Sequence, residues 1–98
     1  MQSFYVYIIE CADGSFYTDH TDDLEARFEQ HLLSKTKSYT SSRKPLKLVY
    51  CSEFSERCQA QEAERQLKGW SRRKKQALIN GEFDLLKFLS KNEITPTQ

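Results

Sequence analysis

The sequence has no apolar run that approaches the roughly 20 residues needed to cross a membrane, and no basic leader precedes an apolar stretch at its start. We therefore expect no membrane span, no signal peptide and a cytoplasmic location. Internal repeats and low-complexity segments are also missing. The 98 residues predict a single domain over residues 1–90, followed by a loose C-terminal tail over residues 91–98.

Cysteine is scarce, and its spacing excludes the common cysteine motifs. The chain has three cysteines, Cys11, Cys51 and Cys58, so pairing would leave one over, and none forms a C-x-x-C pair. We interpret them as reduced thiols of a cytoplasmic protein. A zinc site that combines them with His20 or His31 is the minor alternative.

Charge of one sign is missing from two segments and nearly missing from a third. Residues 1–34 hold seven carboxylates and one basic side chain, Arg27, whereas residues 35–47 and 65–75 hold basic residues and no acid. The net charge of +1 hides this sorting. Separated charge of this kind suggests a polyanion partner at the two basic segments. The plainer alternative is that both segments are solvated surface.

The hydrophobic patterns predict an α/β domain of the α+β type. We expect a small three-stranded antiparallel sheet flanked by helices, in the order ββαβααα. Strands are predicted over residues 4–11, 15–20 and 46–54. Three helices are expected to begin at the capping residues Thr21, Ser55 and Ser71, and a short fourth helix over residues 83–89. The third helix should end at Asn80-Gly81, and Leu24, Phe28 and Leu32 should form the apolar stripe of the first.

The turn between the first two strands admits two registers. A two-residue turn at Asp13-Gly14 sends Tyr7 and Tyr17 to opposite faces of the sheet. A three-residue loop with Gly14 in the left-handed conformation places Tyr7 opposite Asp19, and both tyrosines then share one face. We prefer the second register because it gives the two phenols a common purpose, which is a functional argument.

Two polar residues of the first helix lie one turn apart. At 100° per residue, Arg27 and His31 are separated by only about 40° and flank the apolar stripe. The simple alternatives are an arginine that snorkels from the edge of that stripe and a hydrogen-bonded boundary histidine. Near two tyrosines of the sheet, the pair also suits chemistry on a phosphate.

Glu64 is the one carboxylate of the second helix that we expect to point inward. It shares a stripe with Ala60 and Leu67, whereas Glu62 points the opposite way. An inward carboxylate requires a partner or a cation, because a bare buried charge is too costly. The alternatives are a salt bridge to Arg27 or Arg65, and an oxygen ligand for Mg²⁺.

In this order the residues resemble the GIY-YIG nuclease superfamily, most of all its small stand-alone bacterial members. The resemblance covers about residues 4–79. It rests on Tyr5-Val6-Tyr7-Ile8, Tyr17-Thr18-Asp19, Leu24-Glu25-Ala26-Arg27, His31, Tyr39-Thr40, Leu48-Val49-Tyr50, Glu64, Lys68 and Ser71-Arg72-Arg73-Lys74-Lys75. Each tripeptide alone is weak, and the ordered series is specific.

The resemblance implies a DNA endonuclease of low intrinsic specificity that uses one Mg²⁺ or Mn²⁺ ion. Tyr7 would act as general base or orient the attacking water, and Tyr17 would hold the nucleophile or the phosphate. Arg27 would clamp the phosphate, His31 would assist proton transfer, and Glu64 would hold the ion. A phenol needs a nearby cation to lower its pKa for such a role, and Arg27 and the ion are the candidates.

The basic segments would then contact nucleic acid. We expect phosphate contacts or base stacking from Lys37, Tyr39, Arg43, Lys44, Lys68, Arg72, Arg73 and Lys74. Specificity, where present, is expected to come from a protein partner, because the chain has no room for a separate DNA-targeting domain. A third possibility is an interaction domain built on Trp70 and the fourth helix.

The second motif ends in Asp19 where the family has glycine. In the preferred register, Asp19 lies opposite Tyr7, where a carboxylate would disfavour the phenolate and crowd the phosphate. It would alternatively recruit a metal. The alternative function is therefore a nucleic-acid-binding module with impaired catalysis.

Overall fold

The computed structural model describes residues 2–33 and 43–92. Its contacts divide the chain into two compact units, Met1–Lys68 and Gly69–Gln98, and each is described here by itself. The elements follow the predicted order ββαβααα. No helix of the described residues is both long enough and apolar enough to cross a membrane. The prediction of one domain over residues 1–90 stays a prediction. Of the predicted tail over residues 91–98, residues 93–98 lie outside the described residues, and Lys91 and Asn92 belong to the last helix.

The first unit contains a three-stranded antiparallel sheet, which confirms the predicted fold class. Its strands are β1 (Phe4–Glu10), β2 (Phe16–Thr21) and β3 (Lys47–Phe54). They lie in the order β2-β1-β3, so β1 is central and β2 forms an edge. Because β2 is an edge strand, one of its two long edges has no neighbouring strand. Side chains from either face of the sheet can therefore reach it.

The hairpin between β1 and β2 adopts the three-residue loop. Gly14 has a φ of 84°, in the left-handed region that favours glycine. The Cys11 N–H donates to the Ser15 carbonyl at 2.9 Å, and Tyr7 lies opposite Asp19 in the ladder. The register that we preferred on functional grounds is therefore confirmed, and Tyr7 and Tyr17 share one face.

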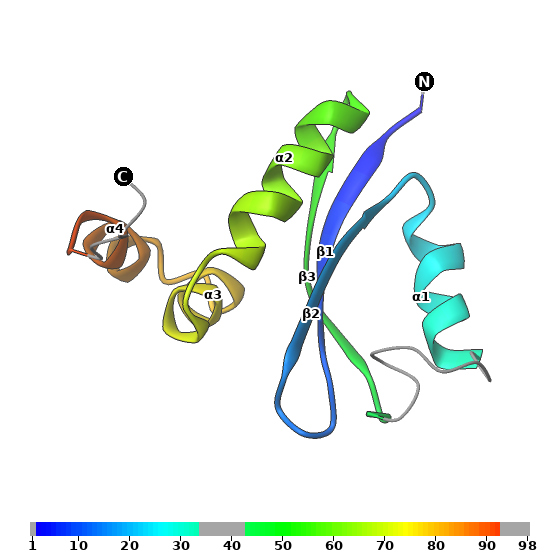
Figure 1. The fold of residues 1–98 in the computed structure, drawn as a ribbon, viewed down its shortest axis with the longest axis horizontal. Coiled ribbons are helices and arrows are strands. Elements are labelled where there is room, and N and C mark those ends of the chain that lie inside the picture. Colours follow the sequence, from blue (N-terminus) through cyan, green and yellow to red (C-terminus); the bar gives the residue numbers. More distant parts are fainter. Residues whose placement is uncertain (1, 34–42, 93–98) are drawn as a thin grey trace. The chain divides into compact units, whose positions relative to one another are not determined.

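Two helices cover opposite faces of the sheet, as Figure 1 shows: α1 (Leu24–Leu33) and α2 (Arg57–Lys68). Because β1 is covered on both sides, its residues are apolar without alternation. Tyr7 and Ile9 face α1, where Leu24 and Phe28 pack against them.

The other face of β1 carries the second half of the core. Val6 and Ile8 point away from the Tyr7 face because side chains alternate along a strand. Both are fully buried, as is Ala60, while Leu67 is almost so. The stripe predicted for the second helix is therefore confirmed, and the same stripe directs Glu64 inward.

Two local predictions about helix ends are wrong. The residue that caps α1 is Asp23, whose Oδ1 accepts from the Ala26 N–H at 3.1 Å. Thr21 stands two residues earlier, and its hydroxyl accepts from the Asp23 N–H. The second helix begins at Arg57, one residue later than a Ser55 cap requires. Competing polar side chains in a run such as Thr-Asp-Asp can each cap, and local geometry selects one.

The apolar stripe of α1 is shorter than predicted. Leu24 and Phe28 pack on the core, whereas Leu32 is 42% exposed. Within the described residues, the helix therefore rests on the sheet through its first two turns, which are the turns that carry Arg27 and lead to His31.

The second unit contains α3 (Arg72–Ile79) and α4 (Phe83–Asn92). Ser71 caps α3 as predicted, since its side chain accepts from the Lys74 N–H at 3.2 Å. Gly81, with a φ of 72°, turns the chain after α3 and confirms the Asn80-Gly81 stop. The last helix extends beyond the predicted end at Leu89 and reaches Asn92.

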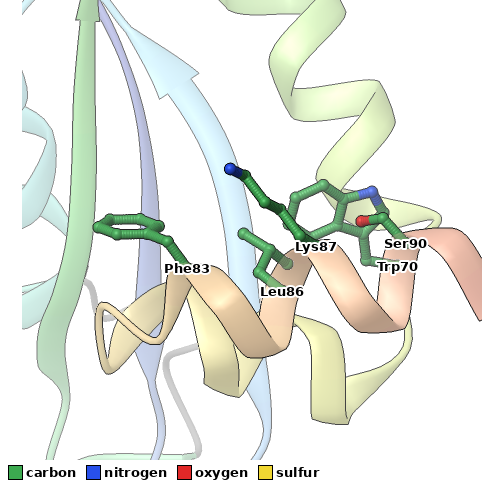
Figure 2. A pocket seen from close by; sticks show the side chains of 5 residues that line it. All are labelled: Trp70, Phe83, Leu86, Lys87 and Ser90. Atoms are coloured by element: carbon green, nitrogen blue, oxygen red, sulfur yellow. The ribbon is translucent and has the colours of Figure 1, made fainter.

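An apolar groove of about 650 Å³ lies within this second unit (Figure 2). Its lining residues are Trp70, Phe83, Leu86, Lys87 and Ser90. The Lys74 ammonium lies 4.4 Å from the centre of the Trp70 ring. Trp70 is half-buried, not a central core residue. The interaction domain considered for Trp70 and α4 stays a prediction.

Candidate active site

One carboxylate oxygen forms the centre of the candidate site. Asp19 Oδ2 accepts a hydrogen bond from the Tyr17 hydroxyl at 3.1 Å and another from the Arg27 guanidinium at 3.1 Å. The Tyr7 hydroxyl lies 3.5 Å from the same oxygen. Tyr7 and Tyr17 come from β1 and β2, and Arg27 comes from α1. Three donors from three elements thus converge on one anionic oxygen.

His31 completes this group on the α1 side of the sheet. Its Nε2 lies 3.0 Å from the Tyr7 hydroxyl. Its ring makes edge contacts with both tyrosines, at 6.0 Å from the Tyr7 ring centre and 5.2 Å from that of Tyr17. The structure therefore brings together four of the predicted catalytic residues, and the one-turn spacing of Arg27 and His31 is what aims both at the hairpin.

The two phenols are held in their neutral forms. Burial raises the pKa of Tyr7 well above its usual value, and the Asp19 charge and the electrostatic interaction with Tyr17 raise it further. Arg27 opposes this rise without cancelling it. Burial and the Asp19 carboxylate likewise raise the pKa of Tyr17 to about 12. Arg27 thus acts on the pKa of Tyr7 in the expected direction, but burial and Asp19 outweigh it, and Asp19 disfavours the phenolate as predicted.

His31 is shifted in the direction that suits a proton acceptor. Burial lowers its pKa below the usual value, the Arg27 charge lowers it further, and Asp19 opposes both. The imidazole is consequently neutral at pH 7 and has one nitrogen able to accept a proton. Since Nε2 faces the Tyr7 hydroxyl, a neutral ring with its proton on Nδ1 can accept a hydrogen bond from Tyr7.

Glu64 points inward from α2, as predicted, and its side chain is only 17% exposed. Its Oε1 lies 2.5 Å from His20 Nδ1 and its Oε2 lies 2.8 Å from the Lys68 ammonium. Neither salt bridge expected for Glu64, to Arg27 or to Arg65, occurs among the described contacts. Arg27 pairs with Asp19 instead, and Arg65 pairs with Glu62. Burial would raise the Glu64 pKa, but the hydrogen bonds from His20 and Lys68 outweigh it and lower the pKa to about 2.

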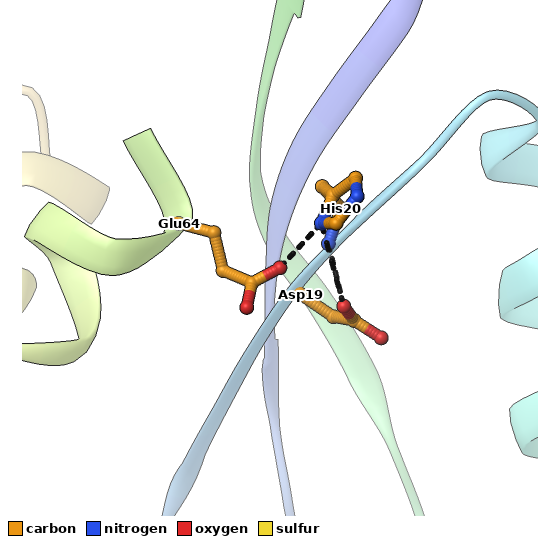
Figure 3. A group of neighbouring side chains, drawn as sticks. All are labelled: Asp19, His20 and Glu64. Atoms are coloured by element: carbon orange, nitrogen blue, oxygen red, sulfur yellow. Dashed lines mark hydrogen bonds and ion pairs between the residues drawn. The ribbon is translucent and has the colours of Figure 1, made fainter. Parts of the chain in front are cut away.

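Asp19, His20 and Glu64 form a cluster of potential metal ligands, shown in Figure 3. One donor atom from each lies within 4.8 Å of the others. Glu64 approaches strand β2 from the α2 side, while the Asp19 carboxylate extends toward α1. The sequence interpretation missed His20 as the partner of Glu64. The alternation of β2 contained the signal, because a residue next to Asp19 on an edge strand must point to the α2 face.

The cysteines play no part in this cluster. Cys11 is buried, and Cys51 and Cys58 are exposed and free, which agrees with reduced thiols. In the two described stretches of the chain, no cysteine joins a group of three or more metal-binding side chains. His20 pairs with carboxylates instead of thiolates, so the minor zinc alternative built on cysteines is not supported.

The predicted nucleic-acid contacts are distributed over both units. Lys37 and Tyr39 lie outside the described residues. Arg43 pairs with Asp13 at 3.1 Å, and the Lys44 ammonium donates to the Leu32 carbonyl at 2.6 Å. Lys68 binds Glu64. Three further predicted contacts belong to α3 of the second unit: Arg72, Arg73 and Lys74.

A hollow of about 550 Å³ beside the start of α1 does not suit a polyanion. Three carboxylates line it, those of Asp22, Asp23 and Glu25. A phosphate would be repelled there. The donors that converge on Asp19 are therefore the better candidate for an anion site.

A hairpin that presents two tyrosines to an arginine and a histidine of the next helix is the arrangement expected from the resemblance to the GIY-YIG superfamily. The family model described as "GIY-YIG catalytic domain" matches residues 3–77. The chain belongs to this family.

Its relatives include small proteins of similar length. A UPF0213 protein of Staphylococcus haemolyticus is 40% identical over 81% of this chain and 96% of its own length. A UPF0213 protein of Staphylococcus aureus is 39% identical with the same coverage. These relatives are made of little more than the matched domain, as the resemblance led us to expect.

Two solution NMR structures resemble the fold. A UPF0213 protein of Bacillus halodurans aligns with a TM-score of 0.53 and 41% identity, over 80% of this chain and 83% of that one. A protein of E. faecalis aligns with a TM-score of 0.56 and 28% identity, over 97% of both chains. The three-stranded sheet with its helices is thus shared with solved relatives.

Proposed function

We propose that the protein is a DNA endonuclease of low intrinsic sequence specificity that depends on Mg²⁺ or Mn²⁺. The observation that supports this most is the convergence of Tyr17, Arg27 and Tyr7 on a single anionic oxygen of Asp19. Groups that hold a carboxylate oxygen in this way are equally suited to a phosphate oxygen. The family adds nucleic acid as the substrate class.

In this proposal Arg27 and Tyr17 hold a non-bridging oxygen of the scissile phosphate. Arg27 also stabilises the negative charge that develops during hydrolysis, because its charge is fixed at the place where that charge appears. The Tyr7 hydroxyl orients the attacking water and relays its proton: Tyr7 takes a proton from the water as it gives its own to His31, whose Nε2 lies 3.0 Å away. A direct phenolate base at Tyr7 is disfavoured by the raised pKa of this residue.

Glu64 is the residue expected to hold the divalent ion. Its carboxylate is deprotonated, directed inward, and grouped with Asp19 and His20, so the donor set fits a divalent cation. When bound, such an ion supplies Lewis-acid stabilisation of the leaving oxygen. Lys68 holds the other oxygen of Glu64 and fixes its orientation.

Asp19 limits the proposed reaction. Its carboxylate accepts the hydrogen bonds that the phosphate would use, so DNA must displace it from Arg27 and Tyr17. Two anions cannot share these donors without repulsion. We therefore expect slow cleavage, and tight binding without cleavage would instead identify a nucleic-acid-binding module.

The experiment is a cleavage assay on nicked, branched and flapped DNA with Mg²⁺ or Mn²⁺. Arg27→Ala should reduce the rate by about 100-fold, the usual effect of removing a donor to a developing charge. Glu64→Ala should abolish metal-dependent cleavage, whereas Glu62→Gln, an exposed carboxylate of the same helix, should leave the rate unchanged. A wild-type rate equal to that of Glu64→Ala would reject the nuclease. Any sequence specificity is proposed to come from a protein partner.

A further inference from the structure

We infer that Asp19, His20 and Glu64 together bind a divalent first-row transition metal ion in preference to Mg²⁺. The inference deepens the proposed function, because it rests on the proposed use of a divalent ion at Glu64. It concerns Asp19 and His20, the two residues that would bind the ion together with the Glu64 carboxylate. Asp19 stands where the family motif has glycine, and His20 follows it on β2.

All three donor atoms lie beside the edge strand β2. Asp19 and His20 belong to this strand, and Glu64 reaches it from α2. His20 Nδ1 lies 2.5 Å from Glu64 Oε1 and 3.9 Å from Asp19 Oδ1. The three side chains are each about one-fifth exposed, so they are partly desolvated but still reachable by an ion from solvent. Figure 3 shows that the His20 ring lies between the two carboxylates.

The chemistry of the donors decides which ion fits. Mg²⁺ requires oxygen ligands in a nearly ideal octahedron and keeps several of its waters. Zn²⁺ and Mn²⁺ accept an imidazole nitrogen together with carboxylates, and catalytic zinc sites typically combine three protein ligands with an open position. A set of one imidazole and two carboxylates therefore favours a transition ion, while Glu64 alone would suit Mg²⁺.

Only small movements are needed to receive the ion. Donor atoms around a four-coordinate zinc ion with bonds of about 2.1 Å lie roughly 3.4 Å apart. The His20–Glu64 contact must therefore open, and the longer separations, which reach at most 4.8 Å, must close. Lys68 holds the other oxygen of Glu64, Oε2, so Oε1 is the oxygen that would face the ion.

Asp19 can act on both sides of β2 at once. Its Oδ2 accepts from Tyr17 and Arg27, while its Oδ1 accepts from the His20 backbone N–H at 2.8 Å and faces the His20 ring. A metal ion on Oδ1 would withdraw charge from the oxygen that occupies the phosphate position. The ion and the Arg27 group are thus linked through one carboxylate.

The test is isothermal titration calorimetry of the full chain with Zn²⁺, Mn²⁺ and Mg²⁺ separately. The wild type should bind Zn²⁺ and Mn²⁺ at least about tenfold more tightly than Mg²⁺. His20→Gln should weaken Zn²⁺ and Mn²⁺ binding by about tenfold or more and leave Mg²⁺ binding nearly unchanged. Glu62→Gln should change none of these affinities. Equal affinities for all three ions, or an unchanged Zn²⁺ affinity in His20→Gln, would overturn the inference.

A second measurement does not depend on the variants. In the wild type, Mn²⁺ should broaden the ring signals of His20 before those of His31 in an NMR titration, because only His20 would touch the ion. Broadening that begins elsewhere would reject the site. The outcomes also separate the two proposals: selective binding of Zn²⁺ and Mn²⁺ without DNA cleavage supports the site and rejects the nuclease. Cleavage with Mg²⁺, together with no effect of His20→Gln on metal affinity, supports the nuclease and rejects the three-residue site.

Discussion

The Tyr17 hydroxyl donates a 3.1 Å hydrogen bond to the Asp19 carboxylate, two positions further along the same strand. Residues two apart on a strand share a face, so this contact follows directly from the extended backbone. Arg27 reaches the same oxygen from α1. The carboxylate therefore satisfies the donors of the candidate phosphate site from within the chain, and most of the predictions below follow from this arrangement.

Replacing Asp19 by asparagine should lower the pKa of Tyr17 from about 12 toward the ordinary value of about 10. Burial will retain part of the shift, but the negative charge is removed, and the neutral amide that replaces it no longer disfavours the phenolate. Tyrosine absorbance or ¹³C NMR of the ring carbon during a pH titration measures this. Asp13→Asn, which removes a carboxylate from the hairpin turn, serves as the control and should leave the pKa of Tyr17 unchanged.

The pKa of His31 should respond in opposite directions to two substitutions. Arg27→Ala should raise it, because the guanidinium charge lowers it in the wild type, and Asp19→Asn should lower it further. The ring proton signals of His31 in an NMR titration report both changes. Arg57→Ala, whose guanidinium lies over Phe4 instead, should have no effect. Movement of the His31 pKa in the same direction in both variants would contradict the geometry around Asp19.

Glu64→Gln should reduce the free energy of unfolding at pH 7 by about 1–2 kcal/mol, since each unit of pKa shift corresponds to about 1.4 kcal/mol and the variant keeps part of the hydrogen bonding. The pKa of Glu64 in the folded state is lowered from 4.5 to about 2. The contribution of the charge is therefore fully present above the unfolded value and is lost as the pH falls through the folded one.

Urea unfolding of both proteins at several pH values between about 7 and 2 measures this difference. The gap between wild type and Glu64→Gln should be constant above about pH 5 and should close below it. Glu62→Gln, a 71% exposed carboxylate two positions earlier, should show no comparable gap at any pH. If the difference in unfolding free energy between the two proteins is still complete at the lowest pH, the Glu64 charge is not its source.

Asp19→Gly should increase the rate of DNA cleavage at saturating Mg²⁺, because the phosphate would no longer compete with a carboxylate for Arg27 and Tyr17. We expect an increase of about tenfold or more, since a single hydrogen bond to a charged group is worth roughly 1.5–3 kcal/mol. The same variant should bind Zn²⁺ more weakly than the wild type, because one of the three proposed donors is removed. A lower rate in Asp19→Gly would show that this carboxylate is required and is no competitor.

Removing Arg72 and Arg73 together should weaken DNA binding and flatten its salt dependence. Both are exposed residues of α3. Each phosphate contact that is lost should reduce the slope of log affinity against log salt by about one unit. Fluorescence anisotropy at several salt concentrations measures the slope for Arg72→Gln/Arg73→Gln. Arg57→Gln, an exposed arginine outside the two basic segments that pairs with Asp22, should leave the slope unchanged.

Local spacing accounts for much of what could be predicted. The hairpin loop is an exception, because the local sequence admitted two registers and the preference for the confirmed one was functional. The one-turn separation of Arg27 and His31 and the inward direction of Glu64 are properties of single elements. They follow from the period of the helix, and the structure confirms them. The cap of α1 was misplaced because several residues of one turn could fill the same role.

What the sequence determined by itself is the direction in which each functional side chain leaves its own strand or helix, because backbone periodicity fixes that direction locally. Only the tertiary structure decided which of these side chains meet. It paired Arg27 with Asp19 and Glu64 with His20, where the sequence offered Arg27 or Arg65 to Glu64. The physical reason is that an ion pair depends on distances of a few ångströms between elements, and these distances are set by how the helices pack on the two faces of the sheet.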